Sequence, residues 1–429
     1  MRKLCLHAVR LADPEQFTAR IAALTGTQAV KGRMQEKSCG DGLSVRYRRY
    51  KLIGSPGGET GQRYTVQTLE GVMLIRSDLI TLYDVVFQYG PGGEAAVRDL
   101  VQRLLAGKDE YVLAEPDLKR RLAAMAGRPY PCLPRSSSWE EAVRHYLPWQ
   151  LYGISWFWYL VLSDRLPRQA VRQLRVKLRR LRSCFVFFKE GLPTDKVREW
   201  QRYFRSEAET LSGLRELDVV LQQCQMIQDR TGQDMGCLIR TFTGLREEAA
   251  SAFYDGNNLN GHTLRLAGFY LWAGTALDWN RSGEDAARYA WRRLGSWVEK
   301  LAELQKRYPD FHNMEDLHKL RIKVKRIRYV LQTVDVLRLP SSLVRQLKQV
   351  QDTLGFLHDD YVNSNWMDAV QRLHPDDAAL DRQIQVFRTS LDARVGQSLE
   401  QVPVLWEGFL ASLQDVMARH RGNGLRRRS

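Results

Sequence analysis

A cationic helix that occurs twice constrains the fold of this chain more than any other feature. The run AVRQLRVKLRRLRS (residues 170–183) carries five arginines and one lysine, and DLHKLRIKVKRIRY (residues 316–329) repeats its pattern later in the chain. A second pair follows in the same order, because LSGLRELDVVL (residues 211–221) is matched by LGFLHDD (residues 354–360). Two successive helices repeated in the same order predict a duplicated helical unit.

Each copy of the repeated helix has an apolar face and a cationic face. Leu174 and Leu178 share one face of the first copy, as Leu320 and Val324 do in the second. Like charges one turn apart destabilise an isolated helix, and neither copy places a carboxylate four residues from the cationic face. The duplication therefore favours a bound polyanion over a solvated surface. The candidate binding residues are Arg172, Arg175, Arg179, Arg182, His318, Arg321, Lys325 and Arg328, with Arg202, Arg205, Arg345 and Lys348 from the helices that follow.

The composition agrees with a polyanionic partner but does not identify it. A net charge of +16 fits nucleic acid, an anionic membrane or an inorganic phosphate polymer. The six cysteines form no CxxC pair, which predicts free thiols in a reducing cytoplasm and no zinc site. The N-terminus lacks the pattern of a signal peptide. The apolar run Trp149–Leu162 is too short to cross a membrane comfortably and is predicted to be a buried helix.

The N-terminal part of the chain has a different pattern, with alternating apolar and polar residues that predict strands. Residues 127–138 are rich in Pro, Ser and Gly and are predicted to link this part to the helical part. The sequence therefore predicts an α+β protein with domains at residues 1–132 and 137–420. The expected strands lie within residues 3–9, 43–50, 63–75 and 80–89, and the expected helices of this part lie near residues 14–24 and 94–105.

The repeated segments resemble the CHAD family, the conserved-histidine α-helical domain. VRQLRVKLRRLRS with LSGLRELDVVL matches the first half of that family, and LHKLRIKVKRIRY with LKQVQDTLGFLHDD matches the second. The resemblance implies two pseudo-symmetric four-helix bundles, at about residues 137–260 and 261–420, that bind inorganic polyphosphate along a basic surface without catalysis. The first signature histidine of the family is Arg172 here, whereas the second is retained as His318. Whether His318 and His358 contact a ligand stays open.

The N-terminal part is similar to a degenerate CYTH domain, the triphosphate-tunnel fold, which implies an antiparallel β-barrel. The E-x-E-x-K motif of that family is replaced by Lys3, Cys5 and His7, and Glu70 occupies the position of a further lysine. A triphosphate hydrolase needs clustered carboxylates that hold Mg²⁺ or Mn²⁺ on the phosphates. We therefore expect no metal site, no cofactor and no catalytic residues.

The favoured interpretation is a polyphosphate-binding protein of the cytoplasm, with association with polyphosphate granules as one option, and no membrane partner. Two alternatives stay open: a CYTH-type triphosphate hydrolase with displaced catalytic residues, and a helical module that binds nucleic acid. The cationic helices lack interleaved aromatic residues for base stacking, which disfavours the second alternative. The sequence does not predict the oligomeric state.

Overall fold

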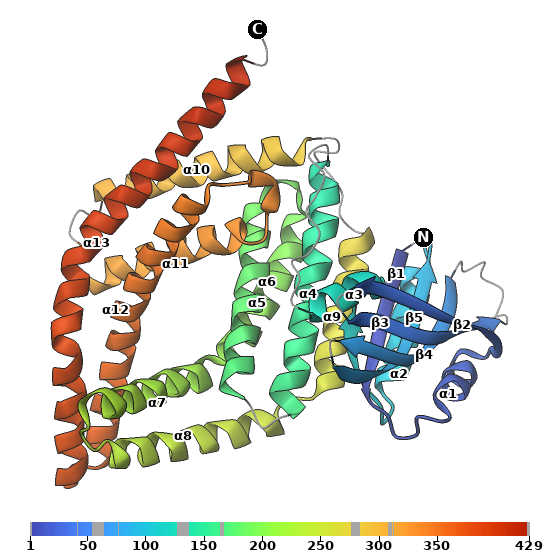
Figure 1. Cartoon of the computed structure of the whole chain (residues 1–429), viewed down its shortest axis with the longest axis horizontal. Helices are drawn as coiled ribbons and strands as arrows, with labels where there is room; N and C mark the ends of the chain where they lie inside the picture. Colours follow the sequence, from blue (N-terminus) through green and yellow to red (C-terminus); the bar gives the residue numbers. More distant parts are fainter. Residues whose placement is uncertain are drawn as a thin grey trace.

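The computed structural model describes residues 2–40, 42–53, 64–75, 77–126, 137–163, 167–275, 284–307, 311 and 313–426. It confirms an N-terminal antiparallel sheet followed by a helical region, with the sheet at one side of the helices (Figure 1). Most of the predicted linker, residues 127–136, lies outside the described residues. The N-terminal elements are β1 (Arg2–Arg10), α1 (Phe17–Thr25), β2 (Gln28–Gly40), β3 (Leu43–Ile53), β4 (Tyr64–Ile75), β5 (Asp78–Tyr89), α2 (Glu94–Leu105), β6 (Glu110–Ala114) and α3 (Leu118–Met125).

The sheet contains the four predicted strands and two that the sequence did not reveal. Its order is β2-β3-β4-β5-β1-β6, and the paired strands are antiparallel. Strand β2 was missed because it is an edge strand whose side chains are almost all exposed, so it shows no apolar alternation. Strand β6 was missed because it is only five residues long.

The closed barrel that the resemblance implied is not seen in the strand pairings, because β2 and β6 end the sheet. The outer edge of β6 instead bonds to helices of the second part. The Tyr111 amide donates to Asn260 Oδ1 (3.2 Å), the Leu113 amide donates to Ser155 Oγ (2.8 Å), and Thr263 Oγ1 donates to the Tyr111 carbonyl (2.7 Å). Side chains of the helical part therefore satisfy the backbone groups that an edge strand would expose.

The helical part consists of two halves with the same order of helices. Helices α4 and α5 correspond to α10 and α11, the pair α6 and α7 corresponds to α12, and the pair α8 and α9 corresponds to α13. Helices α6 and α7 meet at Leu211, whereas α12 continues without a break. The bounds are α4 (Trp139–Ser163), α5 (Arg168–Phe187), α6 (Thr194–Thr210), α7 (Ser212–Thr231), α8 (Gly236–Asp255), α9 (Leu259–Thr275), α10 (Ala286–Arg307), α11 (Met314–Leu331), α12 (Ser341–Leu373) and α13 (Ala378–Arg426).

The two halves meet where α4 and α10 begin. The Trp139 amide donates to the Glu284 carbonyl (2.8 Å), and the Ala286 amide donates to the Ser137 carbonyl (2.9 Å). These bonds form an isolated antiparallel bridge between equivalent segments. The two halves are thereby joined through the same backbone positions of each copy.

Helix α4 contains the apolar run that was predicted to be a buried helix, but it begins earlier, at Trp139. Ser138 and Glu141 form a capping box at its start: Ser138 Oγ accepts from the Glu141 amide (3.2 Å), and Glu141 Oε2 accepts from the Ser138 amide (2.8 Å). Pro148 therefore lies inside the helix rather than at its start. Among the described residues, no helix combines the length and the apolar character that crossing a membrane requires.

Asn260 is the polar centre of the contact between the sheet and the helices. Besides accepting from Tyr111, its Nδ2 donates to the carbonyls of Leu105 (3.0 Å) and Asp109 (2.8 Å). We expect Asn260→Ala to lower the free energy of unfolding by about 1–3 kcal/mol, because it leaves these backbone groups without partners. Hydrogen exchange should show faster exchange at the Tyr111 amide and a smaller change at the Leu113 amide, which Ser155 still holds. Equal protection of Tyr111 in both proteins would contradict this role.

Candidate functional site

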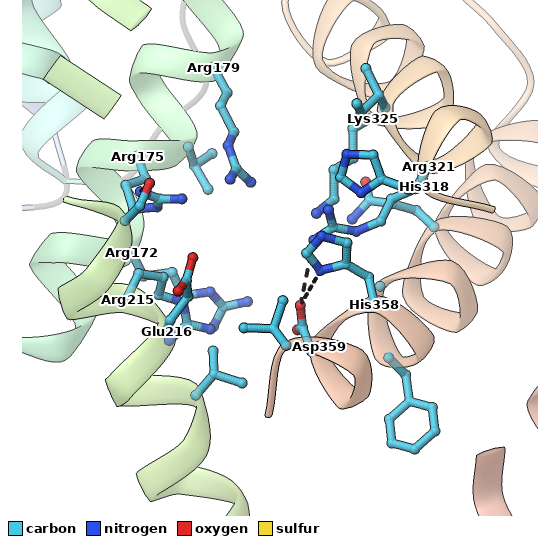
Figure 2. A pocket seen from close by; sticks show the side chains of 18 of the residues that line it. Arg172, Arg175, Arg179, Arg215, Glu216, His318, Arg321, Lys325, His358 and Asp359 are labelled. Atoms are coloured by element: carbon cyan, nitrogen blue, oxygen red, sulfur yellow. Dashed lines mark hydrogen bonds and ion pairs between the residues drawn. The ribbon is translucent and has the colours of Figure 1, made fainter. Parts of the chain in front are cut away.

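A groove of about 1240 Å³ lies between the two copies of the repeated helix. Helices α5, α6 and α7 form one wall, and α11 and α12 form the other, so equivalent residues of the two halves face each other (Figure 2). Side chains point into the groove from both walls, among them Arg172, Arg179 and Arg215 from the first and His318 and Lys325 from the second. The duplication thus produces two facing rows of bases.

The amphipathic pattern of α5 places its cations in this groove. Leu174, Leu178 and Leu181 are fully buried in the core. The same helix geometry then turns Arg172 and Arg179 toward the groove. Leu320, Val324 and Ile327 anchor α11 in the same way. The apolar face therefore fixes the direction of the cationic face in both halves.

The equivalent residues Arg175 and Arg321 lie at the base of the groove, and each is only 8% exposed. Arg175 Nη1 donates to the Ala208 carbonyl (2.6 Å) and to Ser212 Oγ (2.7 Å). Arg321 Nη2 lies 3.5 Å from Asp359 Oδ1. Burial lowers the pKa of Arg175 to about 9 and that of Arg321 to about 10, with Arg179 contributing to both shifts. These two arginines therefore hold the helices together as well as charging the groove.

The second wall carries two stacked histidines. The rings of His318 on α11 and His358 on α12 have centroids 5.0 Å apart and planes inclined by 23°. Burial, His358, Arg321 and Lys325 lower the pKa of His318 below its ordinary value. Burial also lowers the pKa of Lys325 to about 6, with Arg321 and Arg179 adding to the shift. Without a ligand, the groove therefore disfavours protonation of His318 and Lys325.

Nine of the twelve candidate residues line the groove. Of the other three, Arg328 lies 3.8 Å from Asp352, and Arg345 and Lys348 are exposed on α12 outside the groove lining. The nine that line it are Arg172, Arg175, Arg179, Arg182, His318, Arg321, Lys325, Arg202 and Arg205.

Four further cations also line the groove: Arg198, Arg215, Arg326 and Arg394. Arg215 could have been found from the sequence, because it aligns with His358 in the repeated segments. Arg394 could not, because α13 brings it in from outside the repeated motifs; its guanidinium lies over the Phe356 ring, 4.1 Å from the centroid. The groove is therefore more basic than the sequence indicated.

The N-terminal sheet buries two of the three positions where the resemblance places a triphosphatase motif, Cys5 and His7, whereas Lys3 is exposed. Cys5 and His7 lie on the face of β1 that carries a buried ion cluster. His7 Nδ1 lies 2.9 Å from Asp84 Oδ1, and Arg121 donates to Asp84 (3.0 Å) and to Cys5 Sγ (3.2 Å). Burial would raise the pKa of Asp84, but Arg121 and His7 outweigh it and hold that pKa below its ordinary value. The charges of Asp84 and Arg121 therefore compensate each other within the cluster.

Apolar side chains fill the sheet around this cluster. Val45, Tyr47, Met73 and Leu82 on the same face are fully buried. Within the described part of the chain, no three His, Cys, Asp or Glu side chains are placed to hold a metal ion. Strand β3 carries three arginines, Arg46, Arg48 and Arg49. Arg49 borders a small pocket with Lys3, whereas Arg46 is a surface residue.

The fold and the groove define a class: a duplicated all-helical domain with a cationic groove between its halves. Comparison with known families agrees, because the CHAD domain matches residues 155–368. Residues 155–368 of the chain therefore form a CHAD domain. The N-terminal sheet lies outside the matched residues, and its resemblance to CYTH domains stays a prediction.

Two solved structures are similar in fold. The crystal structure of the CHAD domain from the plant Ricinus communis superimposes with a TM-score of 0.54 and 21% identity, covering 65% of this chain and 94% of that one. PptA from Streptomyces chartreusis gives a TM-score of 0.51 and 16% identity, covering 63% of this chain and 100% of that one. At these identities the similarity shows the fold alone. Among curated proteins, no sequence relative is found.

Proposed function

We propose that the groove binds inorganic polyphosphate and that the protein does so without catalysis. One observation carries this proposal: two rows of bases face each other across the groove. In the first row, Arg172, Arg179 and Arg215 form no ion pair with an acidic side chain among the described residues. Arginine donates two parallel hydrogen bonds to a phosphate. Arg172, Arg175, Arg179 and Arg182 of the lining repeat this side chain on successive turns of α5, about 5.4 Å apart. Such a row matches a linear polymer of phosphates. The presence of a CHAD domain supports the same ligand.

A nucleic-acid ligand is less well supported by the lining of the groove. Single strands are bound by aromatic platforms on which the bases stack. Apart from the two histidines, the aromatic residues of the lining are Tyr329, which is buried, and Phe356, which Arg394 covers. The groove therefore offers contacts to phosphates rather than to bases.

The proposed absence of catalysis rests on the residues that the N-terminal sheet carries at the positions of the triphosphatase motif. Lys3 and Cys5 stand where the resemblance requires carboxylates, and His7 stands at the position of the lysine. Cys5 and His7 both contact a neutralised ion cluster. We suggest that this domain is an accessory module that supports α4 and α9. A cytoplasmic location, at polyphosphate granules, belongs to the same proposal.

The direct test is a calorimetric titration of the full chain with polyphosphates of defined length and with RNA of equal charge, at two salt concentrations. We expect tighter binding of polyphosphate at both salt concentrations. Equal or tighter binding of RNA would favour the nucleic-acid alternative. Release of phosphate from tripolyphosphate with Mg²⁺ or Mn²⁺ would instead support a hydrolase.

A further inference from the structure

The two walls of the groove differ in one systematic respect. At three pairs of equivalent positions the first wall carries arginine and the second carries a weaker base. We call the first set the arginine wall and the second the titratable wall. The pairs are Arg172 with His318, Arg179 with Lys325, and Arg215 with His358.

The arginine wall stays cationic throughout the physiological pH range, because guanidinium groups keep their proton in proteins. Burial and Arg172 lower the pKa of Arg215, but from a value far above neutrality. Among the described residues, no ion pair or hydrogen bond engages the three guanidiniums. Their charge is therefore available to a ligand at any pH at which the protein is folded.

The titratable wall has a geometry that resists protonation in the free protein. Two imidazoles with centroids 5.0 Å apart repel each other when both are charged. Burial, His358, Arg321 and Lys325 lower the pKa of His318, and the pKa of Lys325 falls to about 6. The ionisable groups near this wall are Arg321 on α11, Asp359 and Asp360 on α12, Arg175 and Arg179 on α5, Arg215 and Glu216 on α7, and Arg394 on α13.

Asp359 alone does not offset this concentration of bases. Its Oδ1 lies 3.5 Å from His358 Nδ1 and 3.5 Å from Arg321 Nη2, so one carboxylate is shared between two partners (Figure 2). The Nε of Arg321 is buried and has no hydrogen-bond partner among the described residues. The second wall therefore carries less negative charge than its bases need, and a bound polyanion can supply the rest.

We propose that polyphosphate binding is coupled to proton uptake by the titratable wall, so that the groove holds its ligand more tightly in mild acid than at alkaline pH. This inference rests on the proposed function. A polyanion placed along the wall stabilises the charged forms of His318 and Lys325, which burial and the neighbouring cations disfavour in the free protein. Linkage then requires protons to enter with the ligand, and each proton taken up in full changes Kd by about tenfold per pH unit.

The test on the unmodified protein measures the Kd for long-chain polyphosphate from pH 5.5 to 8.5 at constant ionic strength. Long chains keep the titrating end groups of the ligand a small fraction of its charge. We expect Kd to rise at least about tenfold between pH 6 and pH 8. Calorimetry in two buffers of different ionisation enthalpy should show a net uptake of about one proton or more at pH 7. Strong binding with no proton uptake would overturn the inference and leave the proposed function standing.

Exchanging residues between the two walls tests whether the titratable wall causes the pH dependence of binding. His318→Arg, Lys325→Arg and His358→Arg together copy the arginine wall, and this variant should bind at pH 8 at least as tightly as the unmodified protein does at pH 6. Its dependence on pH should be largely lost. If the full pH dependence persisted in this variant, other groups would be responsible and the inference would be wrong.

The reciprocal variant carries Arg172→His, Arg179→Lys and Arg215→His. It should bind at pH 6 but show a steeper loss of affinity by pH 8 than the unmodified protein. An unchanged slope would count against the inference. Absence of binding by the unmodified protein at every pH would refute the proposed function itself, so the two failures are distinguishable.

Discussion

Replacing Arg172, Arg179 and Arg215 with glutamine should weaken polyphosphate binding by at least about a hundredfold. A hydrogen bond to a charged group contributes about 1.5–3 kcal/mol, and a tenfold change in Kd corresponds to about 1.4 kcal/mol. The log–log dependence of affinity on salt should also flatten, on the scale of about 0.9 per lost contact known for duplex DNA. Titration calorimetry at several salt concentrations measures both effects.

A matched control removes three cations from α12 outside the groove lining: Arg345→Gln, Lys348→Gln and Arg372→Gln. We expect this variant to bind nearly as tightly as the unmodified protein. If it lost as much affinity per charge, attraction by overall net charge would explain binding, and the groove would not be the site. The result also decides whether Arg345 and Lys348, which the sequence proposed as contacts, touch the ligand.

The stability of the groove variant should hold or rise slightly, because glutamine relieves repulsion between like charges on α5. Arg175 and Arg321 are left out of the variant on structural grounds. Arg175 bonds to Ala208 and Ser212, and Arg321 pairs with Asp359, so their removal would change stability and binding together. Thermal unfolding of the variant should show a midpoint no lower than that of the unmodified protein.

Arg121→Met should destabilise the N-terminal domain by about 3–5 kcal/mol. Asp84 is completely buried, and Arg121 supplies its cationic partner at 2.9 Å. Removing one member of a buried ion pair leaves an uncompensated charge in the interior. Hydrogen exchange at the β1 and β5 amides measures the loss, because these strands carry His7 and Asp84.

Two further variants separate this effect from a general loss of charge. Arg120→Met removes an exposed neighbour on the same helix and should change stability by no more than about 0.5 kcal/mol. The double variant Asp84→Leu with Arg121→Met should be more stable than Arg121→Met alone, since an apolar pair replaces the buried charge. Wild-type protection of β1 and β5 in Arg121→Met would show that the ion pair contributes little.

The cationic face of the repeated helix shows what helical periodicity can predict from sequence and what it cannot. Local helix geometry determines that Arg172, Arg175 and Arg179 share a face, so their common direction was predictable. The distance between α5 and α11 depends on packing over the whole core, which no local pattern encodes. For the same reason, the sequence did not distinguish Arg175, which hydrogen-bonds to α6 and α7, from Arg179, which forms no ion pair with any residue that the structure describes.

The N-terminal sheet was only partly predictable from its sequence. Strands β4 and β5 were predictable because their buried faces impose alternation, whereas exposed β2 carries almost no apolar signal. The resemblance implied a closed barrel, but the edge of β6 bonds to α4 and α9. That outcome depends on Ser155 and Asn260, which lie far along the chain from β6.

The sequence by itself determined the duplication, the amphipathic character of α5 and α11, and the identity of the bases that each copy carries, because these follow from residue type and helical period. The tertiary structure decided which of those bases face one another, that His318 stacks on His358, and that Arg394 joins them from α13. It also decided the pKa of Lys325, because burial and the neighbouring charges of another helix act through space rather than along the chain.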